Sequence, residues 1–489
     1  KGYIMNKQQK HLIIAVIVGA LIYFLLPEAN GLTKQGISML AVFIPTIYLW
    51  LTCGTGWTSL FSVTMAVLLN AAAGGSAYGT LWGNIVGAAV IPFLMVATVL
   101  EESGAFEWIV KWIISRKFIH GKPTLFMIMF TLAMIIISIF TAPQVVSVLF
   151  FRLLSDVTTS IGYTKEDKFY KSQGLLIGWI SQLCDATLIW GRPYILTMVA
   201  IVAALGFENF TAMTYFKFAF LFLVFAVIVA VLMVKLWMKP DVSKFESCFS
   251  VAADSTDATQ VWATTGDTYA LGGMAIILLC YIMASLEFLG PVASYFSGIT
   301  IAASVTLVCA LLCVITVDGK PVMDLNKSAS KVPWGMIVFL GAIMFYAGAI
   351  GGDQYGITAC LQSILGPVVA QLPVMVTIVI GLIVASLATN FCSNTVSGVI
   401  ICSSCIPALM SVPGISQAQV MGFACAVIAI CGTAICTLSA CPLMGIVYSD
   451  IGIEYKGTAK YSVALCAIMI LICAFILIPA SSVLFAGMV

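Results

Sequence analysis

A run of hydroxyl and amide side chains interrupts an apolar stretch of the sequence near residue 393. Residues 388–398 read ATNFCSNTVSG, in which six side chains are Asn, Ser or Thr. These side chains can serve an anion or a cation, and free half-helix ends offer N–H groups to anions and carbonyl groups to cations. An ordinary polar contact between helices accounts for one or two such residues but not for a cluster. We therefore predict a binding site here.

Asp185 and Arg192 are the other candidates, because both charges lie deep within apolar sequence. Charges inside a membrane cost free energy and usually have a function. In one hypothesis the two residues neutralise each other as a structural pair. In the other, Arg192 gives a bidentate contact to a substrate carboxylate, and Asp185 is a protonatable coupling group or a cation ligand. Both hypotheses stay open at this point.

The elements that would hold these residues are membrane-spanning helices. Apolar residues make up 62% of the 489 positions and charged residues 9%, with a mean hydropathy of +1.11, too little charge for a soluble surface. Apolar runs of roughly 18 or more residues recur, without the alternation of a membrane barrel. The net charge of +2 gives no reason to expect nucleic-acid binding. We expect the sixteen cysteines to be packing residues.

The apolar runs predict about eleven spans and two re-entrant hairpins, 124–154 and 371–411, each interrupted near its middle. With a cytoplasmic N-terminus, this arrangement puts every Lys and Arg on the cytoplasmic side except Lys34, Lys217 and the intramembrane Arg192. We therefore expect an all-α polytopic protein of the inner (plasma) membrane. The predicted spans are 11–26, 36–53, 57–72, 82–101, 174–205, 215–237, 269–287, 296–316, 334–351, 419–448 and 461–485.

The chain contains a weak internal repeat. The sequence WGNIV at 82–86 matches WGMIV at 334–338, and the same offset pairs Thr141 with Ser393 at the two hairpin centres. Because the first hairpin is expected to enter from the cytoplasm and the second from outside, the repeats are inverted, a pattern typical of secondary transporters. The predicted division is a first repeat, a polar cytoplasmic linker and a second repeat, at 1–238, 239–268 and 269–489.

Other segments receive simpler interpretations. The span after each hairpin, 174–205 and 419–448, is predicted to be broken at a Gly-, Thr- and Pro-rich point. Residues 104–118 are predicted to form an amphipathic helix on the inner surface. Glu101 and Glu102 close a span, so we expect them to be a solvated helix end.

The run Ser393-Asn394-Thr395 resembles the Ser-Asn-Thr hairpin motif of the divalent anion/sodium symporter family of the ion transporter superfamily. The resemblance extends from about Gly83 to Ala480 through the order of hairpins and broken helices. It implies a homodimer in which a scaffold holds a transport domain that moves in the manner of an elevator. It also implies sodium ions bound between each hairpin and the following broken helix, and a carboxylate substrate between the hairpin tips.

The first hairpin departs from this pattern. It carries TAPQ at 141–144 where the family has a second Ser-Asn-Thr, so the family's amide is missing or replaced by Gln144. The break that follows carries Asp185 and Arg192 where the family has small neutral residues. If Arg192 stands in for the first sodium ion, fewer sodium ions than in the family pattern, or none, would be coupled.

We therefore predict a secondary active transporter, and not an enzyme, that carries small di- or tricarboxylate-like anions by sodium-coupled symport. A sodium-independent anion exchanger or a proton-coupled symporter on the same scaffold is the alternative, so the coupling ion is Na⁺ or H⁺. A channel and a membrane enzyme are weaker interpretations, since neither a selectivity-filter sequence nor a convergent catalytic constellation is found. The expected partners are the small anion, the lipid bilayer and a second copy of the chain.

The predicted ligands fall into two sets. The substrate set comprises Thr141, Gln144, Thr187, Arg192, Ser393, Asn394 and Thr395. The sodium set comprises Ser393, Asn394, Gly432, Thr433, Thr437 and Asp185.

Overall fold

The computed structural model describes most of the chain. Ser393, the predicted amphipathic helix 104–118 and most of the predicted linker lie outside the described residues. The described ranges are 6–103, 122–189, 192–207, 209–244, 265–285, 290–369, 371–391, 394–410, 412, 414–437, 441–445, 447–448, 453 and 455–486.

The described residues form helices almost throughout, with one short antiparallel pair of strands, β1 (Thr316–Val317) and β2 (Lys320–Pro321). The helices up to residue 238 are α1 (Lys7–Leu25), α2 (Lys34–Cys53), α3 (Gly56–Leu68), α4 (Gly74–Gly83), α5 (Ile85–Ser103), α7 (Pro123–Ser138), α8 (Pro143–Ile161), α9 (Lys168–Thr187), α10 (Pro193–Ala204), α11 (Ala212–Leu232) and η2 (Met233–Met238). The later helices are α13 (Thr265–Ser285), α14 (Pro291–Val314), α15 (Leu325–Ser330), α16 (Trp334–Gly351), η4 (Asp353–Tyr355), α17 (Ile357–Val369), α18 (Val374–Phe391), α19 (Asn394–Met410), α20 (Gln417–Gly432), α21 (Pro442–Gly445), α22 (Tyr455–Ile472), η6 (Cys473–Leu477) and α23 (Ile478–Leu484).

Among the described residues, six helices are long and apolar enough to cross a membrane, and further apolar helices contain 10–17 residues. Several of the shorter helices, such as α7, α19 and α20, are short because a turn or a break divides one apolar stretch in two. The chain is therefore a helical multi-pass membrane protein, as predicted.

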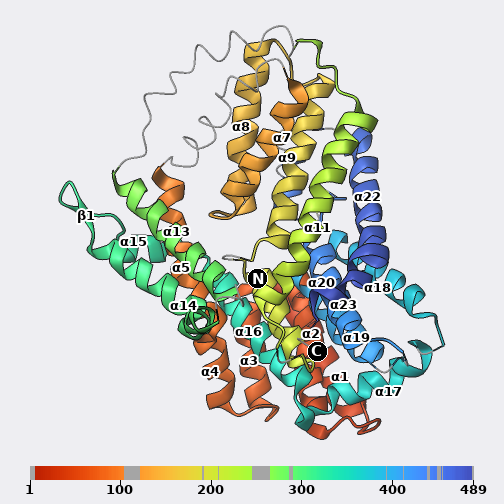
Figure 1. Cartoon of the computed structure of the whole chain (residues 1–489). Helices are drawn as coiled ribbons and strands as arrows, with labels where there is room; N and C mark the ends of the chain where they lie inside the picture. Colours follow the sequence, from red (N-terminus) through yellow and green to blue (C-terminus); the bar gives the residue numbers. More distant parts are fainter. Residues whose placement is uncertain are drawn as a thin grey trace, which may run out of the picture.

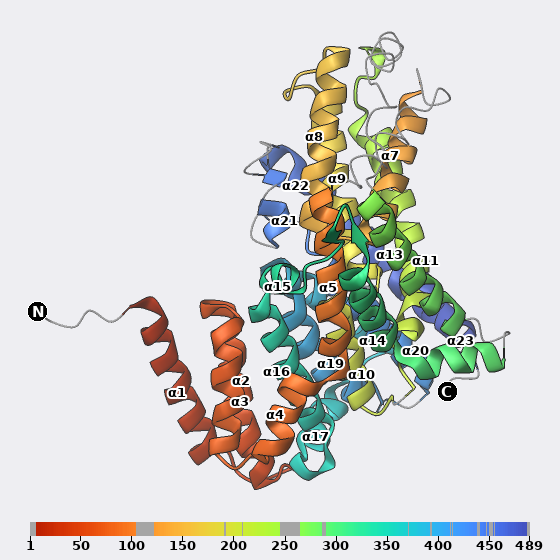
Figure 2. The same cartoon turned by 90° about the vertical axis from the view of Figure 1, so that its left-hand side faces the viewer.

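The helices pack in two groups, which face each other across the site described below. In the α5–α16 bundle, α2, α3 and α4 pack around α16, while α13, α14 and α15 pack against α5. In the α9–α20 bundle, α7, α8 and α11 pack on α9, while α18, α19 and α23 pack on α20. Helix α10 joins the groups, since it contacts both α16 and α19. Helices α7 and α8 extend beyond the α5–α16 bundle at one end of the molecule (Figures 1 and 2).

Helices α9 and α20 form the centre of their bundle. Both are buried along almost their whole length, and they cross where Ala186 meets Gly432. A Cβ atom on Gly432 would lie 2.5 Å from the Cβ of Ala186, so only glycine permits this approach. Gln182 Nε2 donates 2.8 Å to the carbonyl oxygen of Gly432 and so ties the two helix ends together.

Proline sets the boundaries of the interrupted segments. The stretch predicted as the first hairpin consists of α7 and α8, and Pro143 occupies the first turn of α8, where its missing N–H costs nothing. Helix α9 ends at Thr187, Arg192 has an extended backbone, and Pro193 opens α10 in the same way. The stretch predicted as the second hairpin consists of α18 and α19. The described helix ends therefore fall within the polar interruptions of these apolar stretches. That the paired helices are re-entrant hairpins stays a prediction.

The two W-G-x-I-V motifs do not occupy equivalent positions in their helices. Trp334 opens α16, whereas Trp82 lies near the end of α4 and a new helix, α5, begins at Ile85. Asn84 has an extended backbone, and its Oδ1 accepts a hydrogen bond from the N–H of Gly87 at 2.7 Å. An Asn at this position caps the new helix, and the second motif has Met336 there instead. The motif therefore predicts the order of the elements but not their boundaries.

Candidate functional site

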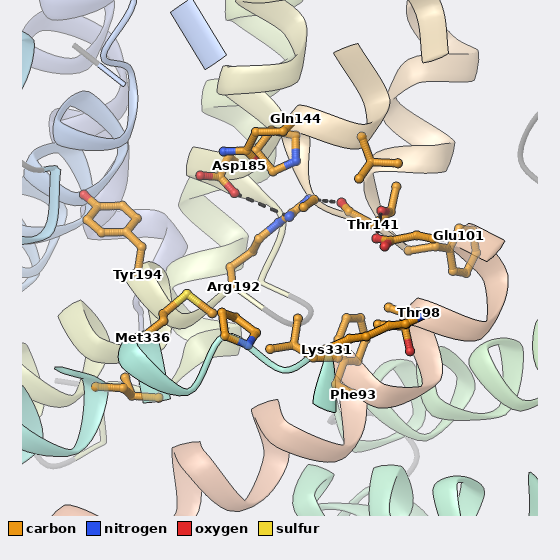
Figure 3. A pocket seen from close by; sticks show the side chains of 18 of the residues that line it. Phe93, Thr98, Glu101, Thr141, Gln144, Asp185, Arg192, Tyr194, Lys331 and Met336 are labelled. Atoms are coloured by element: carbon orange, nitrogen blue, oxygen red, sulfur yellow. Dashed lines mark hydrogen bonds and ion pairs between the residues drawn. The ribbon is translucent and has the colours of Figure 1, made fainter. Parts of the chain in front are cut away.

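A cavity of about 640 Å³ lies between the two bundles. Its volume falls within the range of about 300–1,000 Å³ that is usual for small-molecule sites. Figure 3 shows side chains from α5, α8, α9, α10 and α16 converging on it. The lining residues are Thr55, Phe93, Leu94, Ala97, Thr98, Glu101, Phe140, Thr141, Ala142, Pro143, Gln144, Val145, Asp185, Arg192, Tyr194, Thr197, Lys331, Pro333, Met336, Phe339, Leu340 and Thr395.

Four helices begin at the wall of this cavity. The first turns of α8, α10 and α19 contribute Gln144, Tyr194 and Thr395, and Pro333 precedes α16. A helix N-terminus carries a partial positive charge and free N–H groups, which favour an anion. Four helix N-termini therefore lie at the cavity wall, together with the charged side chains of Glu101, Asp185, Arg192 and Lys331.

Arg192 is the central side chain of the wall. It is only 6% exposed, and its Nη2 donates to the carbonyl oxygens of Ser138 at 2.5 Å and Thr141 at 2.9 Å. Its Nη1 lies 3.4 Å from Oδ1 of Asp185. The guanidinium therefore closes the carbonyl end of α7 and joins the helix break to the first hairpin tip, while its Nε has no partner among the described residues.

The polar contacts continue from Arg192 into the other bundle. Thr141, whose carbonyl accepts from Arg192, donates its hydroxyl hydrogen to a carboxylate oxygen of Glu101 on α5. Asp185, Arg192, Thr141 and Glu101 thus form one connected row across the cavity (Figure 3).

Glu102, the neighbour of Glu101, makes different contacts. Its carboxylate pairs with Lys327 at 3.0 Å and with Lys331, both in the same bundle. Two adjacent carboxylates therefore have separate roles, because only Glu101 reaches the hairpin.

Neutral groups join the second hairpin to its helix break. We call these contacts the second joint, and the contacts of Arg192 with Ser138, Thr141 and Asp185 the first joint. Asn390 Oδ1 accepts from the N–H of Cys436 at 2.7 Å, and the carbonyl oxygen of Asn390 accepts from Thr437 Oγ1 at 2.5 Å. Thr389 donates its hydroxyl hydrogen to the Cys431 carbonyl and lies 3.0 Å from Asn394 Oδ1. Hydroxyl, amide and carbonyl oxygens gather here, the ligand types of alkali-cation sites in transporters.

The structure places the predicted substrate residues in three groups. Thr141, Gln144, Arg192 and Thr395 line the cavity. Asn394 lies beside Thr389 in the second joint, and Ser393 lies outside the described residues. Thr187 is fully buried, and its hydroxyl donates to the Leu183 carbonyl of its own helix at 2.7 Å.

The predicted sodium residues are also divided. Asn394 and Thr437 belong to the polar network of the second joint. The carbonyl of Gly432 accepts from Gln182, and the hydroxyl of Thr433 bonds back to Ala429 of its own helix at 2.7 Å. Asp185 lies on the cavity wall beside Arg192, in the first joint and not in the second.

Sequence reasoning overlooked the residues that the α5–α16 bundle contributes. Glu101 lines the cavity and contacts the hairpin tip, so the expectation of a merely solvated helix end does not describe it. Lys331 lines the same cavity. The sequence around a charge at the end of an apolar run does not indicate which residues that charge contacts. Only the packing of the two bundles identifies Glu101 and Lys331 as cavity residues. Asn390 lies in the polar run 388–398, so the sequence does carry a signal for its role in this network.

Fold and cavity together define a class: a multi-pass helical membrane transporter. A family model described as CitMHS, citrate transporter, matches residues 39–428 of the chain. The chain therefore belongs to the citrate transporter family, which fits membership of the ion transporter superfamily. No curated protein matches it.

Proposed function

We propose that this chain is a secondary active carrier of small organic anions of the di- or tricarboxylate class, with citrate as the first candidate. The family supplies the substrate class. The observation that carries the proposal is the cavity on which four helix N-termini and the buried Arg192 converge. A carboxylate interacts more favourably with each of these groups than a neutral solute does, because its hydrogen bonds with them are charge-assisted.

Arg192 is proposed to act as a fixed cation in the first joint. Its guanidinium donates to the hairpin carbonyls of Ser138 and Thr141, the kind of oxygen that would otherwise coordinate a sodium ion. The unpartnered Nε then remains for a substrate carboxylate. Asp185 pairs with the guanidinium, which limits the cost of burying it.

Sodium is proposed to be the coupling ion, and it would be carried at the second joint. Asn390, Asn394 and Thr437 would hold it. Asn390 and Thr437 already join the hairpin to the break, and Asn394 Oδ1 lies 3.0 Å from Thr389 in the same hairpin. Because Arg192 occupies the place of a cation in the first joint, we expect fewer sodium ions per transport cycle than if both joints bound sodium. For the same reason, anion exchange or proton coupling through Asp185 is the second candidate mechanism.

The transport cycle is proposed to follow the elevator scheme of the divalent anion/sodium symporters, the family whose hairpin motif the run at 393–395 resembles. The α9–α20 bundle would move and the α5–α16 bundle would stay fixed, in support of which the cavity lies between them. A cytoplasmic N-terminus in the inner membrane and a homodimer complete the scheme. In that orientation the exposed edge formed by Glu101 and Lys331 faces the cytoplasm.

The test is uptake of radiolabelled citrate, succinate and malate into proteoliposomes containing the purified protein, with and without an inward sodium gradient, at two external pH values. Sodium-driven accumulation of at least one anion is the expected result. Uptake that ignores sodium but responds to pH or to internal substrate would select the second mechanism. Uptake of none of these anions, in liposomes where empty-vesicle controls hold their gradients, would reject the carboxylate class.

A further inference from the structure

The contact between Glu101 and Thr141 joins the two bundles. Thr141 lies at the tip between α7 and α8, and Glu101 lies near the end of α5. In the elevator scheme these helices belong to parts that move past each other, so the hydrogen bond must break during transport.

Glu101 also has the chemistry of the proposed substrate. Its carboxylate accepts a hydrogen bond from a side chain of the anion cavity, and both residues line that cavity. An incoming carboxylate would need the same donor, since Thr141 has one hydroxyl hydrogen. Glu101 and the substrate therefore compete for one group.

We propose that Glu101 is an internal substitute for a substrate carboxylate, which holds the empty first hairpin against α5 until the substrate displaces it. This inference rests on the proposed function, because it takes a carboxylate as the cargo. Binding of the anion transfers the Thr141 hydroxyl from the α5–α16 bundle to the cargo and frees the hairpin tip to move. Glu101 is thus a positioning residue that lowers the apparent affinity for the substrate and links occupancy of the cavity to release of the tip.

Glu102 provides the matched control. It is the adjacent carboxylate on the same helix, but it pairs with Lys327 and Lys331 in its own bundle. Substitution of Glu102 removes an equal charge near the cavity without touching the hairpin. Any effect seen with Glu101→Ala and not with Glu102→Ala therefore reports the contact with Thr141 and not the general potential.

The experiment compares wild type, Glu101→Ala, Glu101→Gln and Glu102→Ala by citrate uptake in proteoliposomes. Glu101→Ala should lower the KM for citrate by about threefold to tenfold, the scale of one hydrogen bond to a charged group at a partly exposed site. Glu101→Gln should give a smaller decrease, because its amide oxygen still accepts a hydrogen bond. Glu102→Ala unpairs Lys331, which lines the cavity but is exposed, and should therefore change KM by no more than about twofold.

Hydrogen–deuterium exchange of the tip, 138–146, gives a second measurement that does not depend on transport. Without citrate, the tip should exchange faster in Glu101→Ala than in wild type or Glu102→Ala. Citrate should slow exchange in Glu101→Ala and change wild type little, because in wild type one carboxylate replaces another.

A raised KM in Glu101→Ala, or tip exchange identical in the Glu101→Ala and Glu102→Ala variants, would overturn the inference. Failure of the proposed function gives a different pattern: wild type then transports no carboxylate, while exchange of the empty tip still reports whether Glu101 holds it.

Discussion

The two joints between a hairpin and its broken helix solve the same structural problem with opposite chemistry. In the first joint, one cationic side chain, Arg192, spans from the break to the hairpin carbonyls. In the second, the amide of Asn390 and the hydroxyl of Thr437 make the connection with the help of backbone groups. Both arrangements satisfy polar backbone that a membrane would otherwise leave unpaired.

The difference matters because a guanidinium cannot leave. An arginine stays protonated at every physiological pH, so the first joint keeps the guanidinium charge, paired with Asp185, throughout the transport cycle. The second joint contains no formal charge among its described residues, so it can gain and lose a cation. Such an asymmetry would let one joint recognise the anion while the other couples it to an ion gradient.

Substitution of Arg192 should have the largest effect. Arg192→Gln leaves Asp185 and two hairpin carbonyls without their partner, and truncating one member of a buried ion pair costs about 3–5 kcal/mol of stability. We expect uptake to fall by about 100-fold or more, since a charge-assisted contact to the substrate is lost as well. Arg192→Lys should be intermediate, because it keeps the charge but loses the planar fork. Uptake and the thermal unfolding midpoint in detergent are the measurements.

The double variant Asp185→Asn with Arg192→Gln separates the two hypotheses for this pair. If the residues are only a structural pair, removing both charges should restore stability and uptake together. If Arg192 binds the substrate, the unfolding midpoint should recover in part while uptake stays lost. Full activity of Arg192→Ala would remove Arg192 from the site altogether.

Substitution of Asn390 should have the next largest effect. Asn390→Ala removes the acceptor of the Cys436 N–H and the donor to the Ser386 carbonyl, at 2.7 Å each. If the second joint carries sodium, we expect the half-saturating sodium concentration to rise by about tenfold, equivalent to one lost ligand contact of about 1.4 kcal/mol. The dependence of initial uptake rate on sodium is the measurement, with a Hill coefficient near one in wild type. An unchanged sodium dependence in this variant would contradict the assignment.

The sequence predicted the positions of the interruptions well, for a physical reason. A proline in the first turn of a helix leaves no backbone acceptor unpaired, and Pro143 and Pro193 lie at helix starts. Proline alone does not mark a break, because Pro45, Pro92 and Pro407 lie inside helices. The polar residues beside Pro143 and Pro193 are the additional signal. Asp185 and Arg192 were recognised from the cost of burying charge. The Gly-, Thr- and Pro-rich run that contains both residues also predicted the break between them, and α9 ends at Thr187.

The partners of these residues could not be read from the sequence. Arg192 donates to the backbone carbonyls of Ser138 and Thr141, and a carbonyl has no sequence signature. Glu101 depends on how the two bundles lie against each other, which no local pattern determines. Thr187 shows the opposite case: a hydroxyl beside a break has the sequence signature of a ligand, but in the structure it donates to the Leu183 carbonyl of its own helix. Its role as a substrate ligand stays a prediction.

A matched pair of hydroxyl deletions gives the smallest effects and tests the comparison most closely. Thr187→Val should change uptake by less than about twofold, because its hydroxyl satisfies only the Leu183 carbonyl, which the helix can serve without it. Thr437→Val deletes the equivalent hydroxyl beside the second break, which donates to the Asn390 carbonyl. This variant should raise the half-saturating sodium concentration by about fivefold, equivalent to a loss of about 1 kcal/mol of binding free energy. Initial rates over a range of sodium and citrate concentrations distinguish the two. Equal effects would mean that the joints use their hydroxyls alike and that the contrast between them lies in Arg192 alone. A large change in the KM for citrate in Thr187→Val would instead indicate that Thr187 contacts the substrate. The cavity would then have to extend toward the end of α9 during the transport cycle.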